Sequence, residues 1–187
     1  MVSNIRRDPI IGCNFSVALL PSKDADGAGT GTIALSTAGT RSYAGFAEVS
    51  GLELMMTVED YSSGGINDRT LKFPGHIKWS NIVLKRGIVG RRDPLDDTDL
   101  WTWFNEYLEG RGTRRDGLIT LLGADRSPVH VWSFRRGLPA KWTGPSLNAG
   151  RSEVAIEALE IAHEGVCRED AGGALGKAVG AVVDAIF

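Results

Sequence analysis

A histidine and a glutamate stand side by side near the end of the chain, in the segment EALEIAHEGV at residues 157–166. An imidazole beside a carboxylate could act as a general acid–base pair or form the edge of a metal site. Adjacent side chains on a regular strand or helix point in different directions, so His163 and Glu164 would need partners from elsewhere. The other histidines, His76 and His130, supply no HxH or HExxH spacing. The sequence therefore favours a structural role for His163.

Other signatures of catalysis or ligand binding are incomplete. The glycine-rich GAGTGT at residues 27–32 lacks the Lys-Ser/Thr pair of a phosphate-binding loop, and no GxSxG nucleophile motif is present. One acidic cluster is more typical of a solvated surface than of a calcium loop, and it consists of Asp93, Asp96, Asp97 and Asp99. The sequence predicts a protein without enzyme activity, and it indicates no metal and no cofactor.

The composition is that of a soluble globular protein of one domain, with or without an appendage. The 187 residues are 42% hydrophobic and 24% charged, and the net charge of -2 disfavours a basic nucleic-acid binder. No apolar run reaches the roughly 18–20 residues of a membrane span, so we expect no membrane-embedded segment. The N-terminal stretch lacks the apolar region of a secretory signal. Cys13 and Cys167 have no motif spacing, which favours free thiols in a reducing cytoplasm. The 24 glycines suit a turn-rich β protein.

Alternating apolar residues predict most of the regular structure. Strands are expected at 13–20, 43–50, 52–60, on both sides of Pro74-Gly75, at 82–85, 117–123 and 129–134. In 52–60 the alternation predicts one buried face, formed by Leu52, Leu54, Met56 and Val58. Glu53 and Glu59 fall on the opposite face.

One segment has clear helical spacing. Its apolar positions are Leu100, Phe104, Tyr107 and Leu108, with Asp97 or Thr98 as the expected N-cap and Gly110 as the stop. Residues 153–163 also carry an apolar helical stripe, so their pattern alone favours a helix. The alanine- and glycine-rich residues 171–187 are expected to form a short helix.

The order of several short segments is more specific than any one of them. In sequence order they are GFAEVSGLELMM, SSGGINDRTLKFPGHIKWSNIVLKRGI, LWTWFNEY, RRDGLITLL, VWSFRRGLPAKWTGPSLNAG and EVAIEALEIAHEG. Over roughly residues 13–165 this series resembles the inner tube proteins of contractile phage tails and related contractile injection systems. These form the myophage tail tube family, which is related to the Hcp-type tube protein of type VI secretion.

The resemblance implies a mostly β fold of two packed antiparallel sheets, a β-sandwich or barrel, with one flanking α-helix at about 100–109. It implies hexameric rings that stack into a hollow tube, in which strands from all subunits join one lumenal β-barrel. It also implies a strand, not a helix, at 153–163. The tube domain would span residues 1–165, with a flexible loop at 21–42 that is longer than the family requires. Residues 166–187 would form a C-terminal extension, expected as a short helix.

The resemblance also suggests where subunits meet. Candidates for the lumen or a subunit interface are Glu53, Glu59, Lys85, Arg86, His163 and Glu164. The loop at 61–70 would reach toward the neighbouring ring, with the candidates Ser63, Gly64, Gly65, Asn67, Asp68 and Arg69. An acidic lumen would keep DNA or acidic cargo from sticking, because like charges repel.

The implied partners are further copies of the chain, a contractile sheath protein, baseplate or spike proteins, tube-terminating proteins, and DNA or protein cargo. Assembly would take place in the producer's cytoplasm, and the product would be a phage virion tail or a released, extracellular injection particle. Two other interpretations stay open: a type VI secretion-type tube protein, and a β-sandwich glycan-binding module that uses the tryptophans. A metal hydrolase at His163 is a further alternative.

Overall fold

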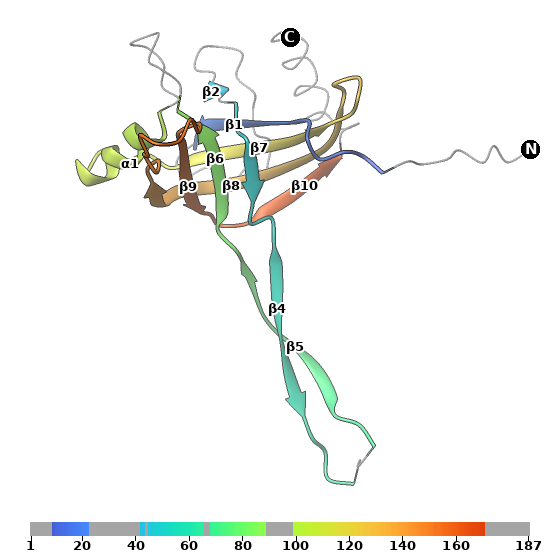
Figure 1. Ribbon diagram of the computed structural model, residues 1–187. Helices are drawn as coiled ribbons and strands as arrows, with labels where there is room; N and C mark the ends of the chain where they lie inside the picture. The colour runs from blue at the N-terminus through green and yellow to red at the C-terminus, as the bar shows by residue number, and fades with distance from the viewer. Residues whose placement is uncertain (1–8, 23–41, 44, 66–67, 89–98, 171–187) are drawn as a thin grey trace, which may run out of the picture.

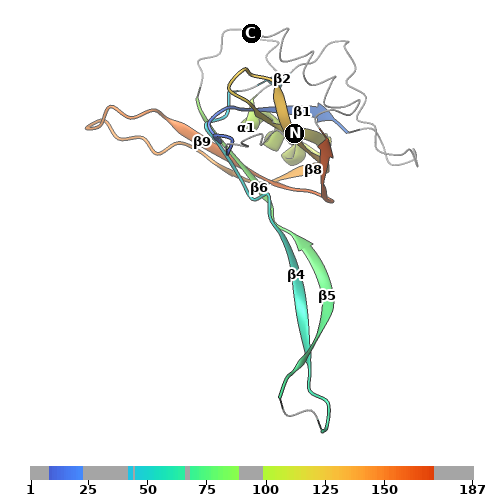
Figure 2. The ribbon, with the colours of Figure 1, turned by 90° about the vertical axis from the view of Figure 1, so that its right-hand side faces the viewer.

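The computed structural model describes residues 9–22, 42–43, 45–65, 68–88 and 99–170 of the chain (Figure 1). Most of the predicted loop 21–42, the loop residue Asn67, and the predicted helix at 171–187 lie outside the described residues. The described part consists of a body from which one β-hairpin projects, as the two perpendicular views in Figures 1 and 2 show.

The described residues are mostly β, with one helix. The elements are β1 (Phe15–Pro21), β2 (Ser42–Tyr43), β3 (Glu48–Ser50), β4 (Leu54–Tyr61), β5 (Leu71–Trp79), β6 (Ile82–Gly87), α1 (Leu100–Leu108), β7 (Arg115–Leu122), β8 (Pro128–Thr143), β9 (Ile156–Ala162) and β10 (Val166–Asp170). Every strand pairing among the described residues is antiparallel. The prediction of a mostly β fold with antiparallel sheets and a flanking helix is confirmed.

The 16-residue strand β8 belongs to two sheets. Its first half pairs with β7 on one edge and β10 on the other, and β1 and β2 extend this sheet, here called sheet I. Its second half pairs with β9, which continues through β6 to β3 in sheet II. Where the sheets meet, Arg136 has a φ of 50° and Gly165 a φ of 144°. The backbone N–H of Glu164 donates to the carbonyl of Arg135 at 3.1 Å, so the strands stay bonded through this junction.

The main core lies between the two sheets. It contains Val17, Leu19, Ile119 and Phe134 from sheet I, Ile82, Leu84, Leu159 and Ile161 from sheet II, and Leu100 and Trp103 from α1. The predicted alternation in β6 is confirmed, because Ile82 and Leu84 are both fully buried. Gly117 makes this packing possible, since a Cβ there would lie 2.1 Å from the Phe134 ring. Sheet I also buries Leu118, Leu122 and Val131 on its other face.

The helix α1 closes one flank of this core (Figure 1). Its N-cap is Asp99 rather than Asp97 or Thr98, and the Asp99 carboxylate accepts from the backbone N–H of Trp101 at 3.2 Å. Gly110 ends the helix with a φ of 73°, as predicted. Of the apolar positions at helical spacing, Leu108 is exposed. Trp103 is buried instead, one helical turn after Leu100, and its indole N–H donates to the carbonyl of Thr113.

Residues 156–162 form strand β9, so the helix favoured by their pattern is wrong and the strand implied by the family resemblance is confirmed. The strand lies between β6 and β8, and this pairing overrides a weak helical preference. The C-terminal extension expected as a helix from residue 166 begins instead with strand β10, which pairs with β8.

Candidate assembly interface

The strands β4 and β5 form a projecting hairpin, and among the described strands they pair only with each other. Cross-strand partners share a face, so the pairs Leu54–Trp79, Met56–Ile77 and Val58–Pro74 place six apolar side chains on one side. We call this set the apolar face: Leu54, Met56, Val58, Pro74, Ile77 and Trp79. Pro74 and Gly75 do not separate two strands, because β5 runs through them with a register shift between Met56 and Val58.

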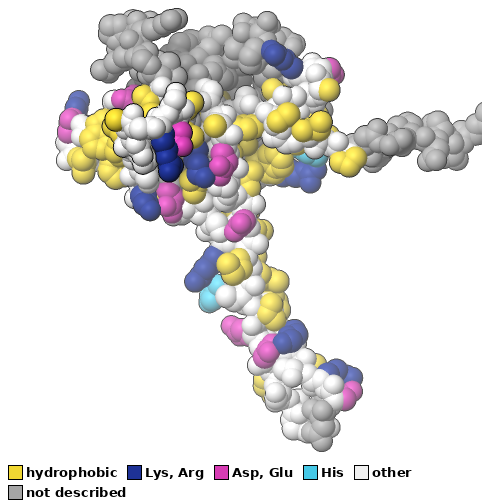
Figure 3. Space-filling view, viewed as in Figure 1, with side chains coloured by type: hydrophobic (Ala, Val, Ile, Leu, Met, Phe, Trp, Pro, Cys, Tyr) yellow, Lys and Arg dark blue, Asp and Glu magenta, His cyan; other side chains and the backbone are white. Residues whose placement is uncertain are grey.

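The apolar face is not buried in the single chain. Leu54, Met56, Val58 and Ile77 are between 48% and 60% exposed, so the buried face predicted for 52–60 is wrong for the subunit alone. Figure 3 shows hydrophobic side chains distributed along the hairpin. Apolar side chains that line up on a protruding element mark an interaction surface, since leaving them in water is costly.

The opposite face of the hairpin is mixed. It carries the pairs Met55–Lys78 and Glu59–Phe73, and the rings of Phe73 and Tyr61 lie 6.1 Å apart. Glu59 is therefore exposed and lies on the face of the hairpin opposite Met56 and Val58, as the alternation predicts. The alternation in the sequence correctly assigned the side chains to the two faces of the hairpin. It could not show that both faces are exposed to water in the single chain.

The loop at the hairpin tip contains the predicted inter-ring residues. Ser63, Gly64, Gly65, Asp68 and Arg69 line a shallow hollow there. The guanidinium of Arg69 donates to Asp68 at 3.4 Å, and Gly65 has a φ of 97°. The loop thus exposes backbone groups and one pair of opposite charges at the end of the hairpin that is farthest from the body (Figure 1).

Hydrogen bonds within the root of the hairpin, and one to Glu160 of sheet II, hold the root in place. The backbone N–H of Ser80 donates to the Glu53 carbonyl at 3.2 Å, and the Ser80 hydroxyl donates to the Glu53 carboxylate at 3.3 Å. The Asn81 amide donates to Glu160 at 2.8 Å. Gly51, with a φ of 86°, passes so close that a Cβ would lie 2.0 Å from the Asn81 carbonyl oxygen. Glu53 is therefore part of the hairpin root, and Asn81 and Glu160 are contacts that no sequence motif predicted.

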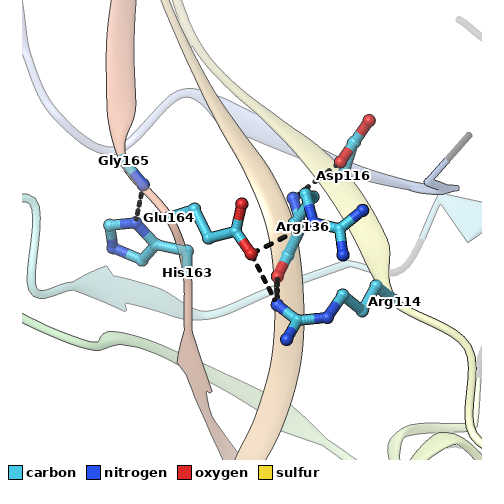
Figure 4. A network of polar contacts seen from close by, with 6 residues as sticks. All are labelled: Arg114, Asp116, Arg136, His163, Glu164 and Gly165. Atoms are coloured by element: carbon cyan, nitrogen blue, oxygen red, sulfur yellow. Dashed lines mark hydrogen bonds and ion pairs between the residues drawn. The ribbon is translucent and has the colours of Figure 1, made fainter. Parts of the chain in front are cut away.

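His163 also contacts this root. Its Nε2 lies 3.0 Å from the Ser80 carbonyl oxygen, and its Nδ1 accepts from the backbone N–H of Gly165 at 3.2 Å (Figure 4). A carbonyl can only accept, so the geometry assigns the proton to Nε2 of a neutral ring. Trp79 and Phe134 pack against the ring with centroid distances of 6.1 and 5.9 Å. Both nitrogens are engaged with backbone, so His163 is structural.

Glu164 lies in a separate network at the junction of the sheets. Its carboxylate accepts from the guanidinium groups of Arg114 and Arg136, each at 3.0 Å (Figure 4). Arg114 also donates to the Arg136 carbonyl at 2.9 Å, and Asp116 accepts from the Arg136 backbone N–H at 2.8 Å. These bonds stabilise the positive φ of Arg136. His163 and Glu164 therefore belong to two different hydrogen-bond networks. Among the described residues, no group of three or more potential metal ligands exists.

Lys85 and Arg86 point to opposite faces of β6. Lys85 donates to Glu48 at 2.9 Å on the outward face of sheet II. Arg86 lies inside, where it donates to the buried Glu157 at 2.7 Å and pairs with the N-cap residue Asp99 at 3.7 Å. Of the two candidates, Lys85 is on a surface that a channel or another subunit could reach, and Arg86 is in the interior.

The outward face of sheet II is charge-balanced. Cross-strand partners place Lys85 beside Glu48, and Lys141 beside Glu160. Two of the tryptophans contact each other: Trp142 donates its indole N–H to Glu157 at 3.0 Å, and Trp101 packs on Trp142 with centroids 4.7 Å apart. That arrangement does not favour a glycan platform.

Comparison with known proteins identifies the family of this chain. The model of the T4-like virus tail tube protein gp19 family matches residues 12–167, which is most of the chain. The chain belongs to this tail tube family. It is thus a structural tube subunit, and the resemblance found from the sequence is confirmed. No curated protein matches the chain. No helix in the described residues has the length and apolar character needed to cross a membrane.

Solved structures share the tail tube fold with this chain. A chain in the cryo-EM structure of the anti-feeding prophage baseplate has a TM-score of 0.71 and 23% identity, over 88% of this chain and 98% of its own length. A chain in the PVC sheath–tube complex, an extracellular contractile injection system, has a TM-score of 0.65 and 20% identity, over 90% and 94%. A chain in the anti-feeding prophage cap has a TM-score of 0.67 and 19% identity, over 91% and 99%.

Proposed function

We propose that this tail tube protein forms hexameric rings that stack into the hollow inner tube of a phage tail or a contractile injection particle. The observation that carries the proposal is the exposed apolar face of the β4–β5 hairpin. A subunit that stayed alone would leave this face in water, whereas a subunit in a tube buries it against other copies.

Lateral contacts would use the open edges of sheet II. Among the described strands, β3 has only β6 as a partner in this sheet, and residues 138–143 of β8 pair only with β9. Joining the β3 edge of one subunit to the β8 edge of the next extends the sheet around a closed barrel and removes both edges. This supports a ring built from one repeated, heterologous contact.

The channel wall in this proposal is the outward face of sheet II. Lys85, Glu48, Lys141 and Glu160 would then face the channel in equal numbers of each sign. Any net acidity would come from the hairpin residues Glu53 and Glu59. Such a wall offers DNA or protein cargo no strongly attractive surface, which suits passage rather than binding.

A contractile sheath would surround the tube, and baseplate and tube-terminating proteins would bind its ends. Support comes from the related folds, which occur in a baseplate, a sheath–tube complex and a cap. We propose assembly in the producer's cytoplasm, no catalytic activity, and release as part of the particle. Genes for a sheath, a spike and a baseplate beside this one would indicate a phage tail or injection particle.

The test is negative-stain electron microscopy and native mass spectrometry of the protein produced with its neighbouring sheath and baseplate genes. We expect hexameric rings or stacked tubes with an open channel from the wild type. Met56→Lys should abolish tubes, because it places a charge in the apolar face. Leu108→Lys, at an exposed site on α1, should leave them intact. A wild-type protein that stays monomeric under these conditions contradicts the proposal.

A further inference from the structure

Sheet I has a second face, on the side away from the main core, and this face is largely apolar. Cross-strand partners share a face, so the pairs Ala18–Leu118 and Thr120–Val131 place these side chains together. Core residues such as Ile119 alternate with them along the same strands. We call the following set the outer face: Ala18 and Leu20 of β1, Leu118, Thr120 and Leu122 of β7, and Val131 and Ser133 of β8.

The outer face is buried, and its cover does not come from the described strands or helix. Val131 is 0% exposed, and Leu118, Thr120 and Ser133 are 2%, 2% and 3% exposed. In the described part of the chain, the apolar residues that pack on this cluster come from sheet I itself. Sheet II and α1 contribute to the main core on the opposite face. An uncovered sheet face stays in contact with water, so another part of the chain must cover this one.

The segment 171–187, which lies outside the described residues, follows directly on a strand of sheet I. β10 ends at Asp170 and pairs with β8, and in this register Cys167 is the partner of the outer-face residue Ser133. The chain therefore needs only a turn to pass from β10 onto the outer face. The family match ends at residue 167, so the segment 171–187 is an addition to the shared tail tube fold.

The sequence of 171–187 has the pattern of a helix with one apolar side. At about 100° per residue, five apolar side chains larger than alanine fall in one sector of the helix: Leu175, Val179, Val182, Val183 and Ile186. The charged residues Lys177 and Asp184 fall on the opposite side. At about 1.5 Å per residue, such a helix would be about 25 Å long. The strands from β10 to β1, at about 4.8 Å apart, span about 15 Å, so the helix is long enough to cross them.

We propose that residues 171–187 form an amphipathic helix that packs its apolar side on the outer face of sheet I of the same chain. The contact removes the apolar side chains of both surfaces from water, while Lys177 and Asp184 remain solvated. The loop at 23–41 is less suited to this task. It is rich in glycine, threonine and charged residues, and Ile33 and Leu35 are its only apolar side chains larger than alanine.

The proposed tube gives this helix a position in the particle. Sheet II faces the channel there, so the outer face of sheet I and its helix look away from the channel. The side of the helix with Lys177 and Asp184 would then belong to the exterior of the tube, which a sheath surrounds. This consequence rests on the proposed tube, whereas the contact between helix and sheet does not. The contact is therefore tested on monomers isolated by gel filtration.

Thiol accessibility tests whether the segment covers the outer face. In a Cys13→Ser, Cys167→Ser background, Thr120→Cys places a single thiol in the middle of this face, and its rate of reaction with the thiol reagent DTNB is measured. Val179→Asp then puts a charge on the apolar side of the helix. Ala181→Asp is the matched control, because it puts the same charge on the side of Lys177. We expect Val179→Asp to raise the rate at least about tenfold and the control to raise it less than about twofold, since docking would bury an unpaired charge only in the first.

Hydrogen–deuterium exchange gives a second readout that needs no introduced thiol. In the wild type, the amides of 171–187 should be protected, because a helix that is packed on a sheet opens only rarely. Val179→Asp should remove this protection, and Ala181→Asp should retain it. Tryptophan fluorescence shows whether each variant is folded. If Val179→Asp does not fold, Val179→Ala takes its place, and we expect it to raise the thiol reaction rate at least about threefold.

Several results would overturn the proposal. The first is rapid reaction of the introduced thiol before any change in the segment, and the second is unprotected amides at 171–187 in the wild type. Equal effects of Val179→Asp and Ala181→Asp would show that no particular side of the segment packs on the sheet. No effect of Val179→Asp would assign the cover to another segment, such as 23–41. Protection that is lost on dilution would assign it to a second copy of the chain. Whether tubes form is measured separately and decides only the proposed function.

Discussion

Lys85 and Arg86 are neighbours in β6, yet their ion pairs lie in different environments. Arg86 and Glu157 have side chains that are 11% and 6% exposed, whereas Lys85 and Glu48 are 41% and 52% exposed. Removing one partner of a buried pair leaves an uncompensated charge in the interior, while water replaces the partner of an exposed one. At the scale of single residues, burial therefore decides which pair stabilises the fold.

Arg86→Met should lower the free energy of unfolding by about 3 kcal/mol, since Glu157 then stays buried without its ionic partner. Lys85→Met, one residue away, should change it by less than about 1 kcal/mol. Urea denaturation followed by tryptophan fluorescence measures both. Equal effects of the two substitutions would show that burial does not determine how much each ion pair contributes to the free energy of unfolding.

Tyr107 presents the opposite case, a buried polar group without a hydrogen bond. Its hydroxyl has no partner among the described residues, and burial raises the pKa of this phenol. Tyr107→Phe should therefore keep or raise stability, by up to about 1 kcal/mol. The wild type should also lose stability as the pH rises above 10, because the unfolded phenol ionises first. Thermal unfolding at pH 8 and pH 10.5 tests this, and a pH dependence that is the same in Tyr107→Phe would refute it.

At the scale of elements, the direction of the hairpin depends on the short break between β3 and β4. Gly51 has a positive φ and lies against the Asn81 carbonyl. The Asn81 amide bonds to Glu160 of β9, and His163, just after β9, contacts the Ser80 carbonyl of the root. The chain therefore changes direction at the root, where β3 leads into β4 and β5 leads into β6. A glycine is needed because any side chain would collide with the opposing backbone.

Gly51→Ala should destabilise the protein by more than about 1 kcal/mol, because the left-handed conformation and the close approach both disfavour a Cβ. Gly64→Ala at the hairpin tip is the control, since nothing lies within 4 Å of a Cβ there. Unfolding in urea gives the difference, and small-angle X-ray scattering reports whether the hairpin still projects. A Gly51→Ala protein as stable as the Gly64→Ala control would contradict the role assigned to this turn.

At the scale of the whole molecule, the hairpin and the body have separate tasks. Within the described part of the chain, the main core takes no residue from β4 or β5, and these strands pair only with each other. The body should therefore fold without the hairpin, while the hairpin needs a partner to bury its apolar face. Such a division would let the body fold on its own while the apolar face of the hairpin stays free to bind a partner.

A variant in which an Asn-Gly turn replaces residues 54–79 tests this division. Glu53 and Ser80 are already joined by a backbone hydrogen bond of 3.2 Å, so a two-residue turn can close the gap. The urea midpoint should stay close to that of the wild type, and electron microscopy should show no tubes. If the shortened protein fails to fold, the hairpin contributes to the body. Tubes formed by this variant would mean that stacking does not depend on the hairpin.

Much of the fold could be predicted from the sequence because local physics dominates there. The alternation in β6, the helix with its stop at Gly110, and the separation of the hairpin faces all follow from side-chain period and backbone preference. The family, too, was accessible from the order of the motifs. The apolar helical stripe at 153–163 led to a wrong prediction of a helix. Alanine, leucine and isoleucine fit the periods of both a helix and a strand, and only pairing with β6 and β8 selects the strand.

The sequence by itself determined the β-rich class, the alternating faces and the tube family. Only the tertiary structure decided that Arg86 is interior while Lys85 is exposed, and that His163 binds the hairpin root while Glu164 stabilises the sheet junction. It also decided that the apolar face of the hairpin is uncovered. The physical reason is that alternation divides a strand into two faces, but what covers each face depends on segments far away in the chain or on another subunit.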